Sequence, residues 1–312
     1  MIVKTSPKEN TFKDTAAFLS EGELRSFATN GFVSITGISP PGELSRIRAI
    51  LADLIARRVG EKEGSLFDTM ESSTNQNAPK SIQLTNPSNY NAWLLQTDYV
   101  RNATRVAHQL LPGCFLSCDF VLVKRAKVGL GTPWHQDEAY FDPEYDHGTL
   151  TFWMPLQDVG PDDGCMIYVP GSPQMGVLAH RSLHDDPHTH AFECAVSFNQ
   201  DQSVAVPLQA GDCVVHGQRT LHRSTNNQSS VDRYAYLLTF VTTPVLARYP
   251  RKAPWLEQRR SIDQEKKRAW MLRGGVFVLV LRKIRKLRSR APSMYLVYLK
   301  RGVNEIFRAH RS

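Results

Sequence analysis

The stretch Thr132-Pro133-Trp134-His135-Gln136-Asp137 lies between two apolar, strand-like runs and carries two metal ligands, an imidazole and a carboxylate. On an extended backbone the side chains of residues i and i+2 lie on the same face, so His135 and Asp137 project in the same direction. The pair forms two thirds of the 2-His-1-carboxylate motif that binds Fe(II) and leaves other coordination positions open. A His-x-Asp pair alone also occurs as an ordinary hydrogen-bonded pair on a protein surface.

A second segment far downstream supplies a third ligand and a cation. Residues 220–224 (Thr-Leu-His-Arg-Ser) contain His222, which would complete the ligand set, and Arg233 follows on an apolar run, 233–240, typical of a buried strand. Because burial of an unpaired guanidinium is costly, Arg233 needs an anionic partner. The distal carboxylate of 2-oxoglutarate has the geometry for a two-pronged contact with Arg233.

In four segments the sequence resembles the phytanoyl-CoA dioxygenase family, a family of Fe(II)- and 2-oxoglutarate-dependent oxygenases. The segments are 133–137 (PWHQD), 164–173 (GCMIYVPGSP), 210–212 (AGD) and 221–224 (LHRS). The resemblance covers about residues 16–245 and implies Fe(II), 2-oxoglutarate and O₂ as the cofactor set. It implies three catalytic metal ligands, His135, Asp137 and His222. It also implies four residues that contact 2-oxoglutarate or support the ligands: Arg233, Ser224, Gln136 and Trp153. Three further residues align more loosely: Lys80, Phe120 and Lys124.

The presence of Asp137 bears on the reaction. In related halogenases a small residue replaces the carboxylate ligand, so the resemblance here implies hydroxylation, desaturation or ring closure. The implied substrate is a small molecule: a secondary metabolite, a sugar derivative, or an acyl group on CoA or on a carrier protein. The alternative hypothesis is a catalytically silent family member that acts as a binding scaffold and is recruited to a membrane or an acidic partner by its basic C-terminal tail. It is disfavoured because neither a ligand nor Arg233 is missing.

The order of helical and strand-like segments predicts the fold class. A chain of 312 residues can hold one catalytic domain and an appendage. Helical patterns come first, with a capping box at Ser20 and Glu23 and apolar periodicity over 41–58 and 92–111. Short strand-like runs follow at 118–124, 149–156, 166–169, 204–208, 213–216 and 233–242. We therefore predict a mainly β fold with helical cover, a double-stranded β-helix (jelly-roll, cupin-like) barrel, with the dioxygenase domain at residues 1–245.

Three internal segments carry further expectations. In 149–156, Thr149, Thr151 and Trp153 share one face, which indicates either a strand that lines a pocket or one that is half exposed to solvent. Residues 61–80 have no periodic signal and are expected to form a loop. Residues 174–203 contain a cluster of histidines and are expected to cover the pocket, with a second metal site as the less favoured alternative.

The C-terminal residues 246–312 differ in charge from the rest of the chain. They carry 19 Lys and Arg against 4 Asp and Glu, whereas residues 1–245 carry 19 against 26. An apolar run at 276–281 followed by a basic run at 282–290 predicts a basic, amphipathic helical extension. A membrane surface or an acidic partner suits residues 276–290. Nucleic acid is the weakest candidate because no aromatic residue interrupts the basic run. The alternative is a helix that packs on the acidic body.

Composition also bears on location. The five cysteines are scattered and form no Cys-x-x-Cys motif, which indicates neither a disulfide framework nor a zinc site. Residues 1–10 are polar and lack the apolar core of a secretory signal, and no apolar run approaches the roughly 18 residues that span a bilayer. We therefore expect a cytoplasmic protein, with peripheral membrane contact as an option for residues 276–290.

Overall fold

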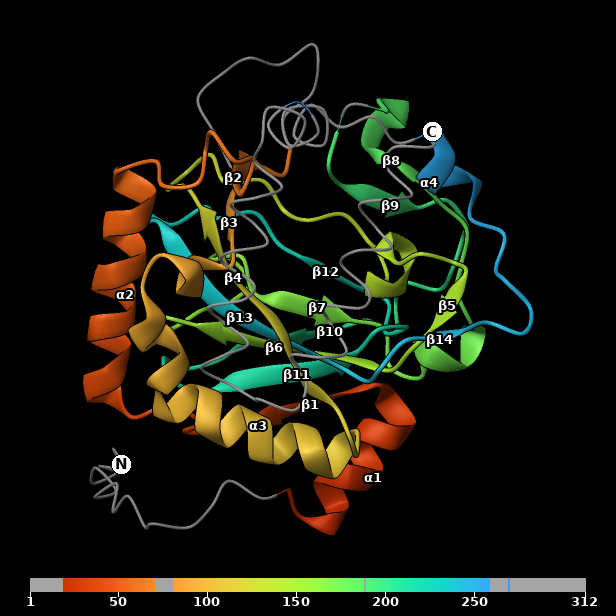
Figure 1. Cartoon of the computed structure of the whole chain (residues 1–312), viewed down its shortest axis with the longest axis horizontal. Coiled ribbons are helices and arrows are strands. Elements are labelled where there is room, and N and C mark those ends of the chain that lie inside the picture. The colour runs from red at the N-terminus through yellow and green to blue at the C-terminus, as the bar shows by residue number, and fades with distance from the viewer. Residues whose placement is uncertain (1–18, 71–80, 188, 259–268, 270–312) are drawn as a thin grey trace, which may run out of the picture.

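The computed structural model describes residues 19–70, 81–187, 189–258 and 269, which form a mainly β structure with helices on its flanks (Figure 1). A seven-stranded sheet has the order β1-β11-β6-β13-β4-β3-β2, and a three-stranded sheet has the order β10-β7-β12. Every strand pair is antiparallel. The two sheets enclose an apolar layer, so the predicted jelly-roll class is confirmed.

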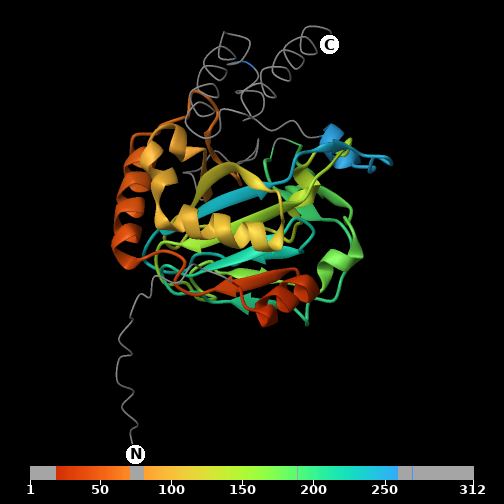
Figure 2. The same cartoon turned by 60° about the horizontal axis from the view of Figure 1, so that its bottom comes forward.

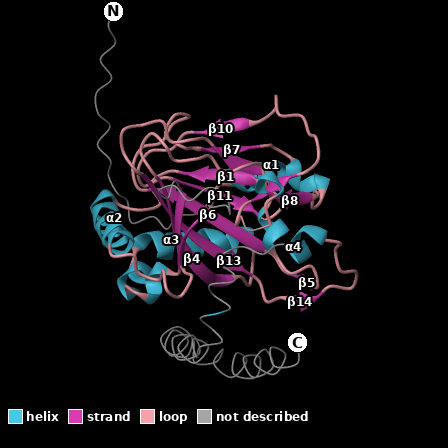
Figure 3. Ribbon diagram, turned by 90° about the horizontal axis from the view of Figure 1, so that it is seen from above, coloured by secondary structure: helices cyan, strands magenta, loops and turns pink. Residues whose placement is uncertain are grey.

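The larger sheet consists of β1 (Phe32–Ile35), β11 (Cys213–Gly217), β6 (Thr149–Pro155), β13 (Arg233–Val241), β4 (Phe115–Lys124), β3 (Ser81–Thr85) and β2 (Leu66–Asp68). The smaller sheet consists of β10 (Val204–Val206), β7 (Met166–Tyr168) and β12 (His222–Ser224). Two short pairs lie outside these sheets: β5 (Tyr145–Asp146) with β14 (Val245–Leu246), and β8 (His180–Ser182) with β9 (Phe192–Cys194). β7 and β10 lie together on one side of the molecule, and β5 and β14 lie near α4 (Pro254–Gln258) on another (Figure 3).

The N-terminal helices form where the sequence predicts them. The helix α1 (Glu21–Asn30) begins with the capping box of Ser20 and Glu23 and ends at Gly31, whose φ of 87° suits glycine. The helix α2 (Pro41–Ala56) buries Leu44, Ile47, Leu51, Leu54 and Ile55, the predicted apolar face. The predicted helix at 92–111 is divided at Thr97. A 3₁₀ helix covers Ala92–Gln96, and the Thr97 side chain caps α3 (Asp98–Leu110).

The central strand β6 separates the helical cover from the barrel interior. All seven of its residues are buried, so the half-exposed alternative is wrong. Leu150, Phe152 and Met154 pack in the core beneath α2 and α3, which lie on one flank of the larger sheet (Figures 1 and 2). Trp153 packs on the opposite face, between the two sheets, and Thr151 points to the same side. The alternation in the sequence therefore identifies the face that lines the interior.

Some segments differ from the prediction. The expected loop at 61–80 contains β2, and β3 follows directly at 81–85, because short strands of mixed polarity give no clear period. Residues 174–203 contain the β8–β9 hairpin. The predicted extension helix at 276–290, Lys80 and His188 lie outside the described residues. Among the described helices, none is long and apolar enough to cross a membrane.

The first part of the C-terminal extension packs against the barrel. Ala253 and Trp255 are buried, and the Trp255 indole N–H donates to the carbonyl of Ala139 over 2.9 Å. The domain boundary at residue 245 stays a prediction.

Candidate metal centre

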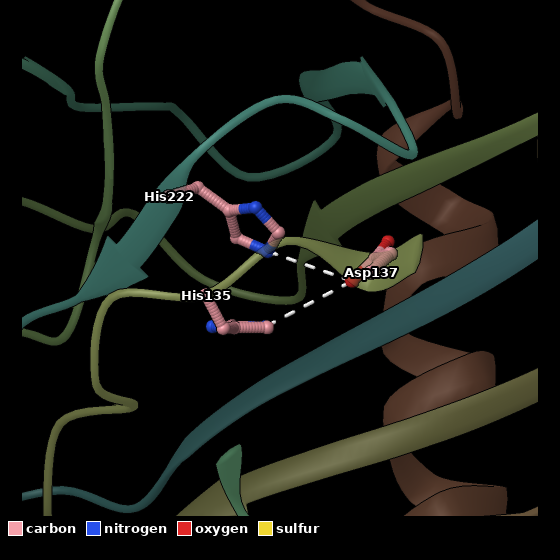
Figure 4. A group of neighbouring side chains, drawn as sticks. All are labelled: His135, Asp137 and His222. Carbon is pink, nitrogen blue, oxygen red and sulfur yellow. Dashed lines mark ion pairs between the residues drawn. The ribbon is translucent and has the colours of Figure 1, made fainter. Parts of the chain in front are cut away.

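Three predicted ligand side chains meet between the two sheets. The backbone of His135 pairs with that of His222 in β12, with N···O distances of 2.9 and 3.0 Å, and Asp137 begins the 3₁₀ helix η3 (Asp137–Tyr140). The Asp137 Oδ1 atom lies 3.8 Å from Nε2 of His135 and 3.7 Å from Nε2 of His222 (Figure 4). One ligand atom from each residue lies within 4.8 Å of the others. These three side chains are close enough that they would hold one metal ion together.

Backbone carbonyls fix the tautomer of both imidazoles. The Nδ1–H of His135 donates to the carbonyl of Pro133, and that of His222 donates to the carbonyl of Thr220, each over 2.8 Å. Each Nε2 lone pair is therefore directed at the ligand cluster, as metal binding requires. Burial lowers the pKa of both histidines, so the neutral form that binds metal persists to a lower pH than in an exposed histidine.

The carboxylate of Asp137 is held by one of its oxygens and leaves the other for a metal. The Thr151 hydroxyl donates to Oδ2 over 2.7 Å, and Nε2 of His216 lies 3.3 Å from the same atom. The hydroxyl of Tyr168 lies 3.0 Å from Nδ1 of His216. The simplest assignment has Tyr168 donating to Nδ1 and His216 donating from Nε2. Because both donors contact Oδ2, Oδ1 is the Asp137 oxygen that would hold a metal ion.

The protonation state of Asp137 also suits a metal ligand. Burial alone would raise the pKa of the Asp137 carboxyl, but the hydrogen bond from His216 and the nearby imidazoles of His222, His216 and His135 bring it well below the ordinary value. The site therefore presents one carboxylate and two neutral imidazoles at physiological pH.

Two buried cations lie beside the cluster, and neither forms an ion pair with a carboxylate of the described residues. Arg233 in β13 is directly opposite Lys124 in β4, and the residues are 2% and 3% exposed. Like charges in directly opposed positions are destabilising. Nε and Nη1 of Arg233 are buried and have no hydrogen-bond partner among the described residues. Burial lowers the pKa of Arg233 to about 9. The pKa of Lys124 is well below its usual value, mainly because the side chain is buried and to a smaller extent because of the charge of Arg233.

The surroundings of these cations fit an anion. Nζ of Lys124 donates to Oγ of Ser224 over 2.7 Å and to the carbonyl of Thr225. The ring of Trp153 lies beneath the guanidinium, with its centroid 5.4 Å from Cζ of Arg233. Of the two residues predicted from the sequence, Trp153 therefore lies beside Arg233 and Ser224 beside Lys124. The unpartnered guanidinium atoms are what a bound carboxylate would satisfy.

Gln136 points away from the two ligands that flank it. Its side-chain amide donates to the carbonyls of Gly176 and Arg219 over 2.8 and 2.7 Å, and its Oε1 accepts from the N–H of Leu178 over 2.8 Å. Of the two roles predicted for Gln136, these bonds fit support of the ligand-bearing strand.

A further support was missed by the sequence analysis. Glu138, which follows the ligand Asp137, is buried and binds Nε of Arg219 over 2.6 Å and Nε of Arg251 over 3.3 Å. Burial raises the pKa of Glu138, but hydrogen bonds from Arg219 and Gln218 outweigh burial and lower it. The ion pair with Arg219 connects η3 to the turn before His222, and the ion pair with Arg251 connects η3 to the start of the C-terminal extension.

The remaining candidates have structural roles in the described residues. Phe120 packs against the apolar layer between the sheets. His180, from the histidine-rich segment, accepts the backbone N–H of Gln136 at Nε2 over 3.1 Å. In the described part of the chain, the only group of three or more potential metal ligands is His135, Asp137 and His222. Lys124, which the resemblance implied only loosely, lies directly opposite Arg233. His216 was missed, because only the strand register shows that it lies near Asp137.

Comparisons with known proteins relate the chain to one family. A family model described as phytanoyl-CoA dioxygenase (PhyH) matches residues 27–235. Phytanoyl-CoA dioxygenase 1 of Oryza sativa subsp. japonica is 30% identical over 124 residues, covering 39% of this chain and 43% of the rice protein. L-proline trans-4-hydroxylase of Streptomyces griseoviridis is 26% identical over 175 residues, covering 50% of this chain and 65% of that protein. The matches thus span about half the length of these curated relatives.

A solved structure has the same fold. EvdO2 from Micromonospora carbonacea var. aurantiaca, crystallised as a complex with 2-oxoglutarate, superposes with a TM-score of 0.66 at 24% identity, covering 78% of this chain and 99% of EvdO2. The family model extends over more than half of the sequence, from before β1 into β13. The chain therefore belongs to the phytanoyl-CoA dioxygenase family.

Proposed function

We propose that the protein is an Fe(II)- and 2-oxoglutarate-dependent dioxygenase that hydroxylates an unactivated C–H bond of a small molecule. The observation that carries the proposal is the pair of opposed, buried cations beside a complete ligand set. Two guanidinium atoms of Arg233 have no hydrogen-bond partner among the described residues, and Lys124 lies directly opposite Arg233 on the neighbouring strand. Such an arrangement is costly unless an anion binds there.

The residues have separate tasks. His135, Asp137 and His222 would hold Fe(II) on one side and leave the other positions open. Arg233 and Ser224 would bind the distal carboxylate of 2-oxoglutarate, with Lys124 adding charge and Trp153 fixing the guanidinium plane. When bound, the cofactor set supplies the oxidant, and 2-oxoglutarate leaves as succinate and CO₂. The protein contributes orientation and the exclusion of water.

The residue Asp137 supports hydroxylation over halogenation, since the carboxylate occupies the position that a halide would need. Desaturation and ring closure remain alternatives within the same chemistry. The curated relatives are named for an acyl-CoA and for L-proline, so family membership does not select a substrate. We favour a free or glycosylated secondary metabolite, with CoA-bound or carrier-bound acyl groups as alternatives. A cytoplasmic location, with membrane or acidic-partner contact through residues 276–290, is part of the same proposal.

The direct test is succinate formation by the purified full-length chain supplied with Fe(II), 2-oxoglutarate and O₂. We expect slow, substrate-independent formation of succinate that Asp137→Ala abolishes. The matched control is Asp146→Ala, which removes an exposed carboxylate from β5 and should behave as wild type. Equal rates for wild type and Asp137→Ala would contradict the proposal. No succinate from the wild type would favour the silent scaffold.

A further inference from the structure

A groove of about 800 Å³ lies on the outer face of the strands that carry the metal ligands. The backbone pairing of His135 with His222 places Trp134 opposite Arg223. Because successive side chains alternate between faces, Trp134 and Arg223 point away from the metal centre. The segment 195–198 forms the facing wall, and a backbone bond of 2.7 Å from Cys194 N–H to the Trp134 carbonyl holds that wall beside the strand.

Arg223 is the charged residue of this groove that lacks a counter-charge in the described structure. Its Nε is buried without a hydrogen-bond partner, and no carboxylate of the described residues lies within 4.0 Å of its guanidinium. The other two charged residues that line the groove, Arg181 and Glu193, pair with each other over 2.8 Å. The groove is therefore electropositive at Arg223.

Trp134 provides a fixed aromatic surface next to this cation. The Cζ atom of Arg223 lies 5.3 Å from the ring centroid of Trp134. The edge-on ring of Phe198, with centroids 5.3 Å apart, and a hydrogen bond of 3.3 Å from the indole N–H to Gln200 hold the indole in place. A ligand would meet a preorganised ring and guanidinium, which reduces the entropy lost on binding.

We propose that this groove binds a small organic oxyanion, a carboxylate or phosphate ester attached to a flat apolar group. The guanidinium charge of Arg223, which no carboxylate of the described residues balances, attracts either oxyanion, and the indole packs against the flat group. The volume lies in the range of small-molecule sites, about 300–1,000 Å³.

The groove is distinct from the metal centre. None of the three metal ligands lines it, nor do Arg233 and Lys124, although Ser224 borders both sites. The inference therefore goes beyond the proposed oxygenase function and does not depend on it. A protein without oxygenase activity could still bind the oxyanion.

The test is a titration of the full-length protein in EDTA, followed by ligand-observed NMR. Benzoate and phenyl phosphate are the oxyanion probes, and benzamide is the neutral probe. We expect at least one oxyanion to bind at millimolar concentration and benzamide to bind at least about tenfold more weakly, which corresponds to about 1.4 kcal/mol. The oxyanion that binds more tightly shows whether the groove prefers a carboxylate or a phosphate ester. Equal binding of benzamide, or no binding of either oxyanion, would overturn the proposal.

Variants locate the binding. Arg223→Gln should weaken the oxyanion at least about tenfold, whereas the matched control Arg181→Gln, in the same groove but already paired, should stay within about twofold. Trp134→Leu tests the aromatic surface independently and should also weaken binding. Arg233→Met reports on the 2-oxoglutarate site and should leave binding unchanged. Loss of binding in Arg233→Met, or its retention in both Arg223→Gln and Trp134→Leu, would place the probe elsewhere and refute the proposal.

Discussion

Replacement of Arg233 by Met should stabilise the protein in the absence of 2-oxoglutarate while abolishing the binding of that cosubstrate. Burial lowers the pKa of Arg233 from 12.5 to about 9. At about 1.4 kcal/mol per pH unit, this corresponds to about 5 kcal/mol of unfavourable free energy for the charged form in the folded state. Arg233 is charged in both the folded and unfolded chain below pH 9, so the cost is fully present at neutral pH. It declines only as the pH rises above about 9.

Methionine keeps most of the apolar stem of arginine and removes the charge. Part of the calculated gain is lost because the shorter side chain leaves space near Lys124. We expect the metal-free variant to be more stable than wild type by about 1–4 kcal/mol, as when buried charges elsewhere are replaced by apolar residues. In the wild type, 2-oxoglutarate with Mn(II) at about 100 times its dissociation constant should add about 2.7 kcal/mol. The variant should gain nothing from 2-oxoglutarate.

Urea unfolding of both proteins, with and without 2-oxoglutarate and Mn(II), measures these differences. The matched control is Arg125→Met, which removes a partly exposed guanidinium that pairs with Asp232 over 2.6 Å. This control should lose no more than about 1 kcal/mol and should keep the stabilisation by 2-oxoglutarate. The reasoning is wrong if the metal-free Arg233→Met protein is less stable than wild type, or if 2-oxoglutarate stabilises it to the same extent.

Three further predictions concern the supports of the metal centre. A chain ending at residue 258 should bind Mn(II) with wild-type affinity in isothermal titration. A chain ending at residue 250 loses the hydrogen bond from Trp255 to η3 and should bind Mn(II) more weakly. Equal affinities of the two chains would show that this contact does not support the metal centre. His216→Phe removes the hydrogen bond that His216 donates to the Asp137 carboxylate and should lower Mn(II) affinity about 10–100-fold. An unchanged Mn(II) affinity would contradict this role of His216. Burial lowers the pKa of His180 to about 4 in the folded protein. As the pH falls from about 6.5 to 4, His180 is therefore protonated in the unfolded chain but not in the folded one, and the free energy of unfolding should decrease by about 3 kcal/mol. Urea midpoints measured across that interval should decline less in His180→Gln, and an identical decline would exclude His180 as the cause.

The sequence was informative where one residue type in one local pattern determines the outcome. The apolar spacing of α2 specified its buried face, and the alternation in β6 specified which side chains face the interior. The i, i+2 spacing of His135 and Asp137 predicted that both side chains face the same way. The structure brings them together, although Asp137 begins η3 and does not lie on a strand. The need of Arg233 for an anion followed from its position in an apolar run.

Other features depend on register and on contacts between distant residues, which local patterns do not encode. The opposition of Lys124 and Arg233 requires the pairing of β4 with β13, and His216 reaches Asp137 only because β11 lies beside β6. The same holds for Trp134 and Arg223, which become neighbours through the bridge between their strands. The contact of Trp255 with η3 joins the basic extension to the barrel.

The most direct test of the proposed cofactor site is the visible absorption of the anaerobic protein with Fe(II) and 2-oxoglutarate. Chelation of iron by 2-oxoglutarate gives a charge-transfer band, and the three ligands together with Arg233 should produce that band in the wild type. The band should be absent from Asp137→Ala at the same concentrations. A wild-type protein that retains no iron and gives no band would contradict the assignment of His135, Asp137 and His222 as the metal centre.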